Sequence, residues 1–467
     1  MAMTAGTTLA DRLVEFTRTT RFETLPPAVV VESRRRWIDS LGCAIGALGE
    51  PAPTFARRLA GRIGWTSEET TGTSCRLFGG GRSAPDWAAF SNGVHIRYLD
   101  CNDTYLSKEP AHPSDNFAAV MAVGEHVQAP GIRWIEAAAI AYEVQCRLAD
   151  AFSIRARGWD HVTYGNLSSC LAAAKLLNLD ADQTRHALGI AGTTAAALRL
   201  TRAGELSMWK GCAFAHAARN GVFAALLARE GITGPAPLFE GEMGFWQQVC
   251  GGPFELEQLG GPNNNDWMLP KTSIKFVPAE YHSQSAVAAA YELRQRLDDP
   301  RRITAIRIDT FKTAVEIIAK DPEKWRPKTR ETADHSLPYC FVVALLDGQV
   351  TAAQFADAKL NDPLVLDLVA KTQVVEDPEL TARYPKGIPN RITLTLDDGT
   401  TLEAFNEFPP GHDQNPLSDE QLAAKFHGLA DPILGEEKAQ AILDQAARLD
   451  QDDQPWSVVD HIRLDHS

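Results

Sequence analysis

The sequence predicts a mainly α protein: both ends of the chain form one large all-helical domain, and a smaller α+β lid domain is inserted between them. Two observations support this prediction. The chain before Gly260 and after Asp419 is rich in Ala and carries apolar residues at helical spacing. Between these parts, short runs alternate apolar and polar residues as half-buried strands do. We expect the helical domain to span 1–269 and 405–467, and the lid to span 270–404.

Apolar periodicity places the helices of the large domain. Pro26 and Pro27 open one of the longest, since proline is tolerated in the first turn of a helix. Asp180 is a plausible N-terminal cap for another. The expected helices cover 9–16, 27–45, 87–98, 117–127, 135–152, 167–177, 181–193, 207–230 and 419–449.

The lid follows GGPNNND, which is a loop by composition. We expect strands at 303–309, 371–375, 391–396 and 400–404, and helices near 283–297 and 339–346. The last two strands flank Asp397-Asp398-Gly399, and an Asp-Gly pair between alternating runs is a strong hairpin signal.

Composition and charge narrow the class of protein. A chain of 467 residues is long enough for two domains. The net charge of -14 argues against a nucleic-acid partner, and no apolar run is long enough to cross a bilayer. Eight cysteines without CxxC pairs fit free thiols in a reducing cytosol. We therefore expect a cytoplasmic protein that binds neither nucleic acid nor membrane.

Sequence motifs for metals and cofactors are missing. There is no HExxH, no GxSxG and no zinc-type Cys/His set, and Gly79-Gly80-Gly81 is weak evidence for phosphate binding. Dinucleotide chemistry is therefore unsupported by the sequence.

The densest group of polar residues is the segment YLDCNDTYLSKEPAHPSDN at 98–116, between two apolar, Ala-rich runs. It contains Asp100, Thr104 and His112, and loops held by rigid elements often carry functional residues. Helix capping is an equally good explanation, since Ser114 or Asp115 stands where it would cap the next helix.

Two titratable residues stand near expected helix starts. The positive end of a helix would disfavour protonation of His161, which suits an imidazole that acts near neutral pH. Lys210 lies in the apolar first turn of an expected helix, where a cation opposes the helix dipole. A bound anion would explain a lysine at this unfavourable position. We expect Lys210→Ala to weaken anion binding and turnover with little loss of fold. The alternative for His161 is a packed core histidine, and the alternative for Lys210 is a lysine at the rim of the bundle.

Two segments at the expected domain junction combine reactive side chains. IKFVPAEYHS at 274–283 contains Lys275 and His282, and ADHSLPY at 333–339 contains Tyr339. Clefts form at domain junctions, so both segments are candidates for a site. Each is equally explained as a linker whose polar groups bond only to nearby backbone.

Five segments together resemble the MmgE/PrpD family, whose members include 2-methylcitrate dehydratase and cis-aconitate decarboxylase. They are YLDCNDTYLSKEPAHPSDN, ELSMWKGCAFAHAARN, ITGPAPLFEGEMGF, IKFVPAEYHSQSAVAAA and ETADHSLPYCFVVALLDG, all between 98 and 348. The resemblance implies a helical domain and an α+β lid with the active site between them, a homodimer, and neither a metal nor an organic cofactor.

The resemblance also implies site residues. The family's motif positions fall on Asp100, Thr104, His112, His161, Lys210, Lys275 and Tyr339. Decarboxylase-like members carry the junction histidine where this chain has Gln284. Here His282 stands two residues earlier, as in dehydratase-like members, which favours dehydration.

The chemistry implied by this resemblance starts at a carbon next to a carboxylate. Cations must stabilise the charge that develops there, and a base and an acid must move protons. His112 and His161 are the expected acid–base pair, in either order. Asp100 is expected to orient His112. Thr104, Lys210 and Lys275 are expected to bind carboxylates, and Tyr339 to donate to the leaving group.

The expected activity is that of a metal-independent hydro-lyase on a tricarboxylate such as 2-methylcitrate. A decarboxylase or epimerase that forms the same carbanion on a related polycarboxylate is the alternative. A helical scaffold without activity is a third possibility, favoured if no small polycarboxylate stabilises the protein.

Overall fold

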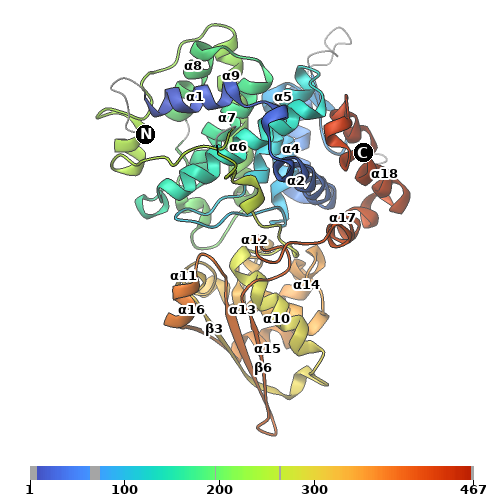
Figure 1. Cartoon of the computed structure of the whole chain (residues 1–467). Coiled ribbons are helices and arrows are strands. Elements are labelled where there is room, and N and C mark those ends of the chain that lie inside the picture. The colour runs from blue at the N-terminus through green and yellow to red at the C-terminus, as the bar shows by residue number, and fades with distance from the viewer. Residues whose placement is uncertain (1–7, 64–73, 195, 262–263, 464–467) are drawn as a thin grey trace.

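The fold is mainly α, as predicted. The structure is a computed structural model and describes residues 8–63, 74–194, 196–261 and 264–463. Figure 1 shows a large helical part and, beside it, a smaller part that combines helices with a sheet. None of the helices in these ranges is both long and apolar enough to cross a membrane.

The large part begins with helices that follow the apolar periodicity of the sequence. A capping box between Thr8 and Asp11 starts the first one. The helices are α1 (Leu9–Thr19), α2 (Pro27–Gly46), α3 (Pro51–Ile63), α4 (Pro85–Tyr98), α5 (Phe117–His126), α6 (Gly131–Ala151), α7 (Val162–Leu176), α8 (Ala181–Thr194) and α9 (Trp209–Arg229). A short antiparallel pair, β1 (Cys75–Arg76) and β2 (Arg82–Ser83), precedes α4.

The C-terminal segment returns to the large part, where α17 (Asp419–Leu434) packs along α2 (Figure 1). The sequence predicts one helix over 419–449. Instead, Gly435 adopts a φ of 81° and separates α17 from α18 (Glu436–Ala446). A residue in this left-handed region interrupts a right-handed helix, and glycine adopts it without steric cost.

The smaller part contains a four-stranded sheet in the order β4-β3-β5-β6. The central strand β3 (Ile303–Thr310) pairs parallel with β4 (Thr372–Glu376) and antiparallel with β5 (Asn390–Leu396). The predicted hairpin is present: β5 pairs with β6 (Thr401–Asn406), and Gly399 in the turn has a φ of 82°. The helices of this part are α10 (Gln284–Arg294), α11 (Lys312–Ile318), α12 (Arg330–Ala333), α13 (Leu337–Asp347), α14 (Asp357–Leu360), α15 (Pro363–Ala370) and α16 (Pro378–Arg383).

Each part has its own hydrophobic core. The first core joins residues between Leu9 and Ile274 to residues between Leu417 and Ile462. The second lies between Val277 and Ala404. The chain therefore passes from one core to the other at Lys275, which places this lysine at the junction.

Candidate active site

Asp100 is the centre of a buried group of charges at the junction of the two cores. It follows α4 with a φ of 53°, and it accepts hydrogen bonds from Arg97 and Lys275. The Nζ of Lys275 lies 2.6 Å from Oδ1 and 2.9 Å from the carbonyl oxygen of Asp100. The Nζ of Lys210 lies 3.4 Å from Oδ2. Three predicted residues, Asp100, Lys210 and Lys275, therefore meet in one place.

Lys210 also links the two parts of the fold. It lies in the first turn of α9, and its Nζ donates to both carboxylate oxygens of Asp334, at 2.7 and 2.8 Å. Asp334 follows α12 in the smaller part. Lys210 is 1% exposed, so the alternative of a lysine at the rim of the bundle is wrong.

The charges in this group favour ionised carboxylates. Burial alone would raise the pKa of Asp100, but Arg97, Lys275 and Lys210 hold it well below its usual value. For Asp334 burial also acts to raise the pKa, and Lys210 and His335 together more than offset it. Three buried cations thus gather around Asp100 and Asp334. Asp115, 3.6 Å from Arg97, and Glu280, which raises the pKa of Lys275, add negative charge, so the group offers an anionic substrate individual cations rather than a net positive charge.

The two predicted catalytic histidines lie together, with ring centroids 5.6 Å apart. The Nδ1 of His161 is 2.8 Å from Oδ1 of Asp160, and the Nδ1 of His112 is 2.8 Å from the carbonyl oxygen of Asp103. A carbonyl oxygen only accepts, so His112 carries its proton on Nδ1 and presents a lone pair at Nε2. The buried Nε2 of His161 has no hydrogen-bond partner in the described part of the chain.

Burial lowers the pKa of both histidines, so both imidazoles are neutral near pH 7. At His161 the neighbouring Asp160 opposes this shift. At His112, Arg97 and Lys275 lower the pKa further. Because these two cations also contact Asp100, the histidine pair lies within electrostatic reach of the charged group.

Several residues of the site were not predicted. His335 places Nδ1 2.7 Å from Asp334 and 3.5 Å from Asp100, and burial together with Lys210 lowers its pKa to about 4. Asp160 orients His161 and is itself held by the Nε of Arg202 at 3.1 Å. His335 and Asp334 stand in the segment ADHSLPY, so their presence among apolar residues was the available signal.

The described contacts do not bring Tyr339 into this group. Its hydroxyl donates to the carbonyl oxygen of Gln354 at 2.6 Å, inside the core of the smaller part. The predicted role as donor to a leaving group therefore lacks support, because α13 directs the side chain into that core.

His282 and Thr104 lie beside the group rather than in it. The Nδ1 of His282 is 2.7 Å from Glu280, whose backbone N–H donates to the carbonyl oxygen of Asp334. The hydroxyl of Thr104 donates to the carbonyl oxygen of Ala111 at 3.2 Å. The polar atoms of both side chains thus form hydrogen bonds with nearby protein groups.

Two further expectations concern neighbouring side chains. Gln284 bonds to the backbone of 276, 277 and 279, which gives it a structural part in the junction. Asp115 does not cap α5: it accepts from Asn102 at 2.7 Å, and burial raises its pKa to about 7. The capping explanation of the 98–116 segment is therefore wrong for Asp115.

Asp100, Asp334 and His335 bring possible metal-ligand atoms within 4.8 Å of one another. Both carboxylates are already bonded to lysine ammonium groups, at 2.6 Å for Asp100 and 2.7 Å for Asp334. A divalent cation at this position would be repelled by both lysines, so the donor set does not fit a metal centre.

Comparison with known proteins identifies the family. The MmgE/PrpD N-terminal domain model matches residues 11–257, and the C-terminal domain model matches 277–451. The chain is 33% identical over 464 residues to 2-methylcitrate dehydratase of Cupriavidus necator, covering 92% of each chain. It is 31% identical over 399 residues to 2-methylcitrate dehydratase of Escherichia coli K12, covering 80% of each. It is 31% identical over 434 residues to alkylcitrate dehydratase phiI of a fungal species (strain ATCC 74256), covering 85% of this chain and 82% of the relative. The chain thus belongs to the MmgE/PrpD family.

Proposed function

We propose that this protein is a hydro-lyase that removes water from a tricarboxylate of the alkylcitrate type, such as 2-methylcitrate, without a metal ion. The observation that carries the proposal is the pair of buried lysines at Asp100, next to two neutral histidines. The dehydratase names of the relatives support the same reaction class.

The proposed reaction begins with removal of a proton from the carbon next to a carboxylate. This proton is weakly acidic, because the carbanion adds charge to a group that is already negative. Lys210 and Lys275 would stabilise that charge, and such cations are most effective where water is excluded. A metal ion is not needed for this task when two ammonium groups are in place.

We assign the base to His161. Asp160 stabilises the imidazolium that forms when His161 takes the proton. His112 has only a backbone carbonyl at Nδ1, and its Nε2 accepts rather than donates. His112 is therefore suited to hold a substrate hydroxyl, and the protonated His161 returns a proton to the departing hydroxyl. A positioned acid–base group contributes about 10²- to 10⁴-fold to the rate.

Substrate must reach side chains that are almost inaccessible. Lys210 and Asp334 are 1% and 0% exposed and lie in different parts of the fold. We propose that the smaller part moves away from α9 to admit the substrate. Lys210 would then exchange the carboxylate of Asp334 for a carboxylate of the substrate.

We further propose a cytoplasmic homodimer. All eight cysteines are free and buried, which supports a reducing compartment. Leu198, Leu200, Trp209 and Phe223 are large apolar residues with at least 45% exposure in and beside α9, which supports a partner surface there. Analytical ultracentrifugation tests the dimer, and a monomer at micromolar concentration would contradict it.

An absorbance screen of chelator-treated protein tests the activity. The substrates are 2-methylcitrate, citrate and cis-aconitate, and the expected product is an unsaturated acid that absorbs in the ultraviolet. Release of CO₂, or uptake of solvent deuterium without elimination, would show a decarboxylase or an epimerase instead. Activity that requires an added metal would contradict the metal-independent part of the proposal.

A further inference from the structure

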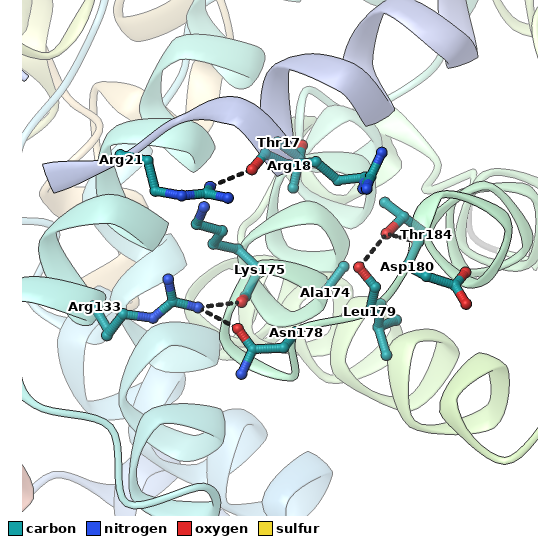
Figure 2. A pocket seen from close by; sticks show the side chains of 10 residues that line it. All are labelled: Thr17, Arg18, Arg21, Arg133, Ala174, Lys175, Asn178, Leu179, Asp180 and Thr184. Carbon is teal, nitrogen blue, oxygen red and sulfur yellow. Dashed lines mark hydrogen bonds between the residues drawn. The ribbon is translucent and has the colours of Figure 1, made fainter. Parts of the chain in front are cut away.

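A cationic cavity lies in the large part of the fold, where α1, α6, α7 and α8 meet (Figure 2). Its volume is about 370 Å³, which is in the range of small-molecule pockets. Four basic residues line it: Arg18, Arg21, Arg133 and Lys175. None of them belongs to the candidate active site, and their concentration is unusual in a chain with a net charge of -14.

The buried member of this group is Lys175, which is 5% exposed. Figure 2 shows its ammonium group directed toward the guanidinium of Arg21, with Arg133 on the other side. Arg133 donates to the carbonyl oxygen of Lys175 at 2.9 Å and to Asn178 at 2.6 Å. Arg18 and Arg21 are exposed at the rim, so the cavity is lined from its floor to its mouth by cations.

The C-termini of two helices compensate part of the positive charge in this cavity. Lys175 and Arg21 donate to the carbonyl oxygen of Thr20, at the C-terminus of α1, and α7 ends beside Arg133. A helix C-terminus carries about half a negative charge, so the two ends contribute about one. Two acidic residues are also near. Asp180 lines the cavity, and Glu136 accepts from Arg133 at 2.6 Å and lies 3.6 Å from Lys175.

Glu15 also lies 3.8 Å from Arg18, but both side chains are largely exposed, and such a surface pair contributes little. A guanidinium has five N–H donors, and the two bonds from Arg21 to backbone carbonyls involve only its Nη1 atom. The cavity therefore offers a ligand four cationic side chains and guanidinium donors of Arg21 that no backbone carbonyl uses.

We propose that this cavity binds a small polyanion, with at least two anionic groups, at a site separate from the active site. Phosphate esters and polycarboxylates share the required chemistry. The lining has no aromatic side chain that would stack on a base or a ring, so the recognised part of the ligand is its charge. The lowered pKa of Lys175, about 8, agrees with this: burial is the largest cause, and Arg21 and Arg133 add to it against Glu136.

Isothermal titration calorimetry of the full chain tests the proposal. The probes are inorganic pyrophosphate and tricarballylate, with acetate as the monovalent control, all at constant ionic strength. We expect saturable binding of at least one polyanion and none of acetate. The two probes distinguish a phosphate source from a carboxylate source.

Variants locate the binding. Arg18→Gln/Arg21→Gln removes two rim charges and should weaken binding about tenfold or more, since a charged hydrogen bond contributes about 1.5–3 kcal/mol. Arg12→Gln is the matched control, because Arg12 lies on the same helix but donates to the carbonyl of Leu256 outside the cavity. It should leave the affinity within twofold.

Proton linkage gives a second readout. An anion beside Lys175 raises its pKa, so binding at pH 8 should take up as much as about half a proton, measured as a difference in heat between two buffers.

No saturable binding, equal affinity in the Arg18→Gln/Arg21→Gln variant, or equal binding of acetate would each overturn the proposal. The first result would mean that the cations only neutralise helix ends.

Discussion

Lys210 and Asp334 form a buried ion pair between the two parts of the fold, with the ammonium nitrogen 2.7 and 2.8 Å from the two carboxylate oxygens. Neither side chain is more than 1% exposed. If one partner of such a pair is removed, the other charge is left buried without compensation, at a typical cost of about 3–5 kcal/mol. The pair therefore links a charge proposed for catalysis to the stability of the junction.

Lys210→Met should consequently lose both turnover and stability. The sequence predicts that Lys210→Ala would spare the fold, and the burial of this pair changes that expectation. Urea denaturation should show a loss of about 3–5 kcal/mol in the free energy of unfolding. In Lys210→Met/Asp334→Asn the unpaired carboxylate is gone, so the double variant should be more stable than Lys210→Met by at least about 1 kcal/mol. Equal stability of Lys210→Met and the wild type would contradict the buried pair.

Asp160→Asn should reduce kcat by about a hundredfold or more, because it removes the charge that stabilises the imidazolium of His161. Asp160 also raises the pKa of His161. A base must be deprotonated to act, so the acid limb of kcat/KM lies below the ordinary histidine pKa of about 6.5. In Asp160→Asn this limb should move to still lower pH, as measured by a pH–rate profile.

Arg202→Gln is the matched control with the opposite sign. Arg202 contacts Asp160 and lowers the pKa of His161, so its removal should move the acid limb to higher pH. If both variants move the limb in the same direction, or neither moves it, His161 is not the group that titrates.

Tyr339→Phe should keep kcat within about twofold of the wild type. The hydroxyl bonds to the carbonyl oxygen of Gln354 and not to any residue of the charged group. Its loss leaves a buried carbonyl without that partner, so the free energy of unfolding should fall by about 1–3 kcal/mol. A large loss of kcat with unchanged stability would restore the catalytic role predicted from the family resemblance.

Stability should fall as the pH is lowered from 6.5 toward 4. His95 and His335 are buried, and burial lowers the pKa of each to about 4. Below pH 6.5 the unfolded chain takes up protons at these residues while the folded chain does not, so unfolding becomes more favourable. Each histidine accounts for about 3 kcal/mol over this range.

Urea denaturation at several pH values measures this dependence. His335→Gln should reduce the slope between pH 6.5 and 4 by at most about 1.4 kcal/mol per pH unit, the value for one proton. An unchanged slope would mean that His335 is already protonated in the folded protein.

Elements marked by a local sequence pattern were predictable. Long periodic segments such as α2 and α7 were located to within a few residues at their C-terminal ends, and the Asp-Gly pair before Thr400 indicated the β5–β6 hairpin. The helix α3 and the short helices α11, α12 and α14 to α16 were not predicted. Gly435 interrupts a periodic run, and only its positive φ reveals the break.

The site was predictable only where a side chain is chemically unusual in its own segment. Asp100, Lys210 and Lys275 were found in this way. Their partners depend on contacts between distant segments: 124 residues separate Lys210 from Asp334, and no local pattern indicates that pair. Tyr339 illustrates the reverse, since its motif matches the family but the packing of α13 directs its hydroxyl to Gln354.

The most direct measurement is the rate at which His161→Gln forms an unsaturated acid from 2-methylcitrate, relative to the wild type, with both proteins treated with chelator. We predict that the wild type catalyses the reaction and that the variant is slower by at least about a hundredfold, while thermal shift shows that it is folded and still stabilised by the substrate. Equal rates in the two proteins, or a correctly folded wild type that releases no water from any tricarboxylate, would contradict the account.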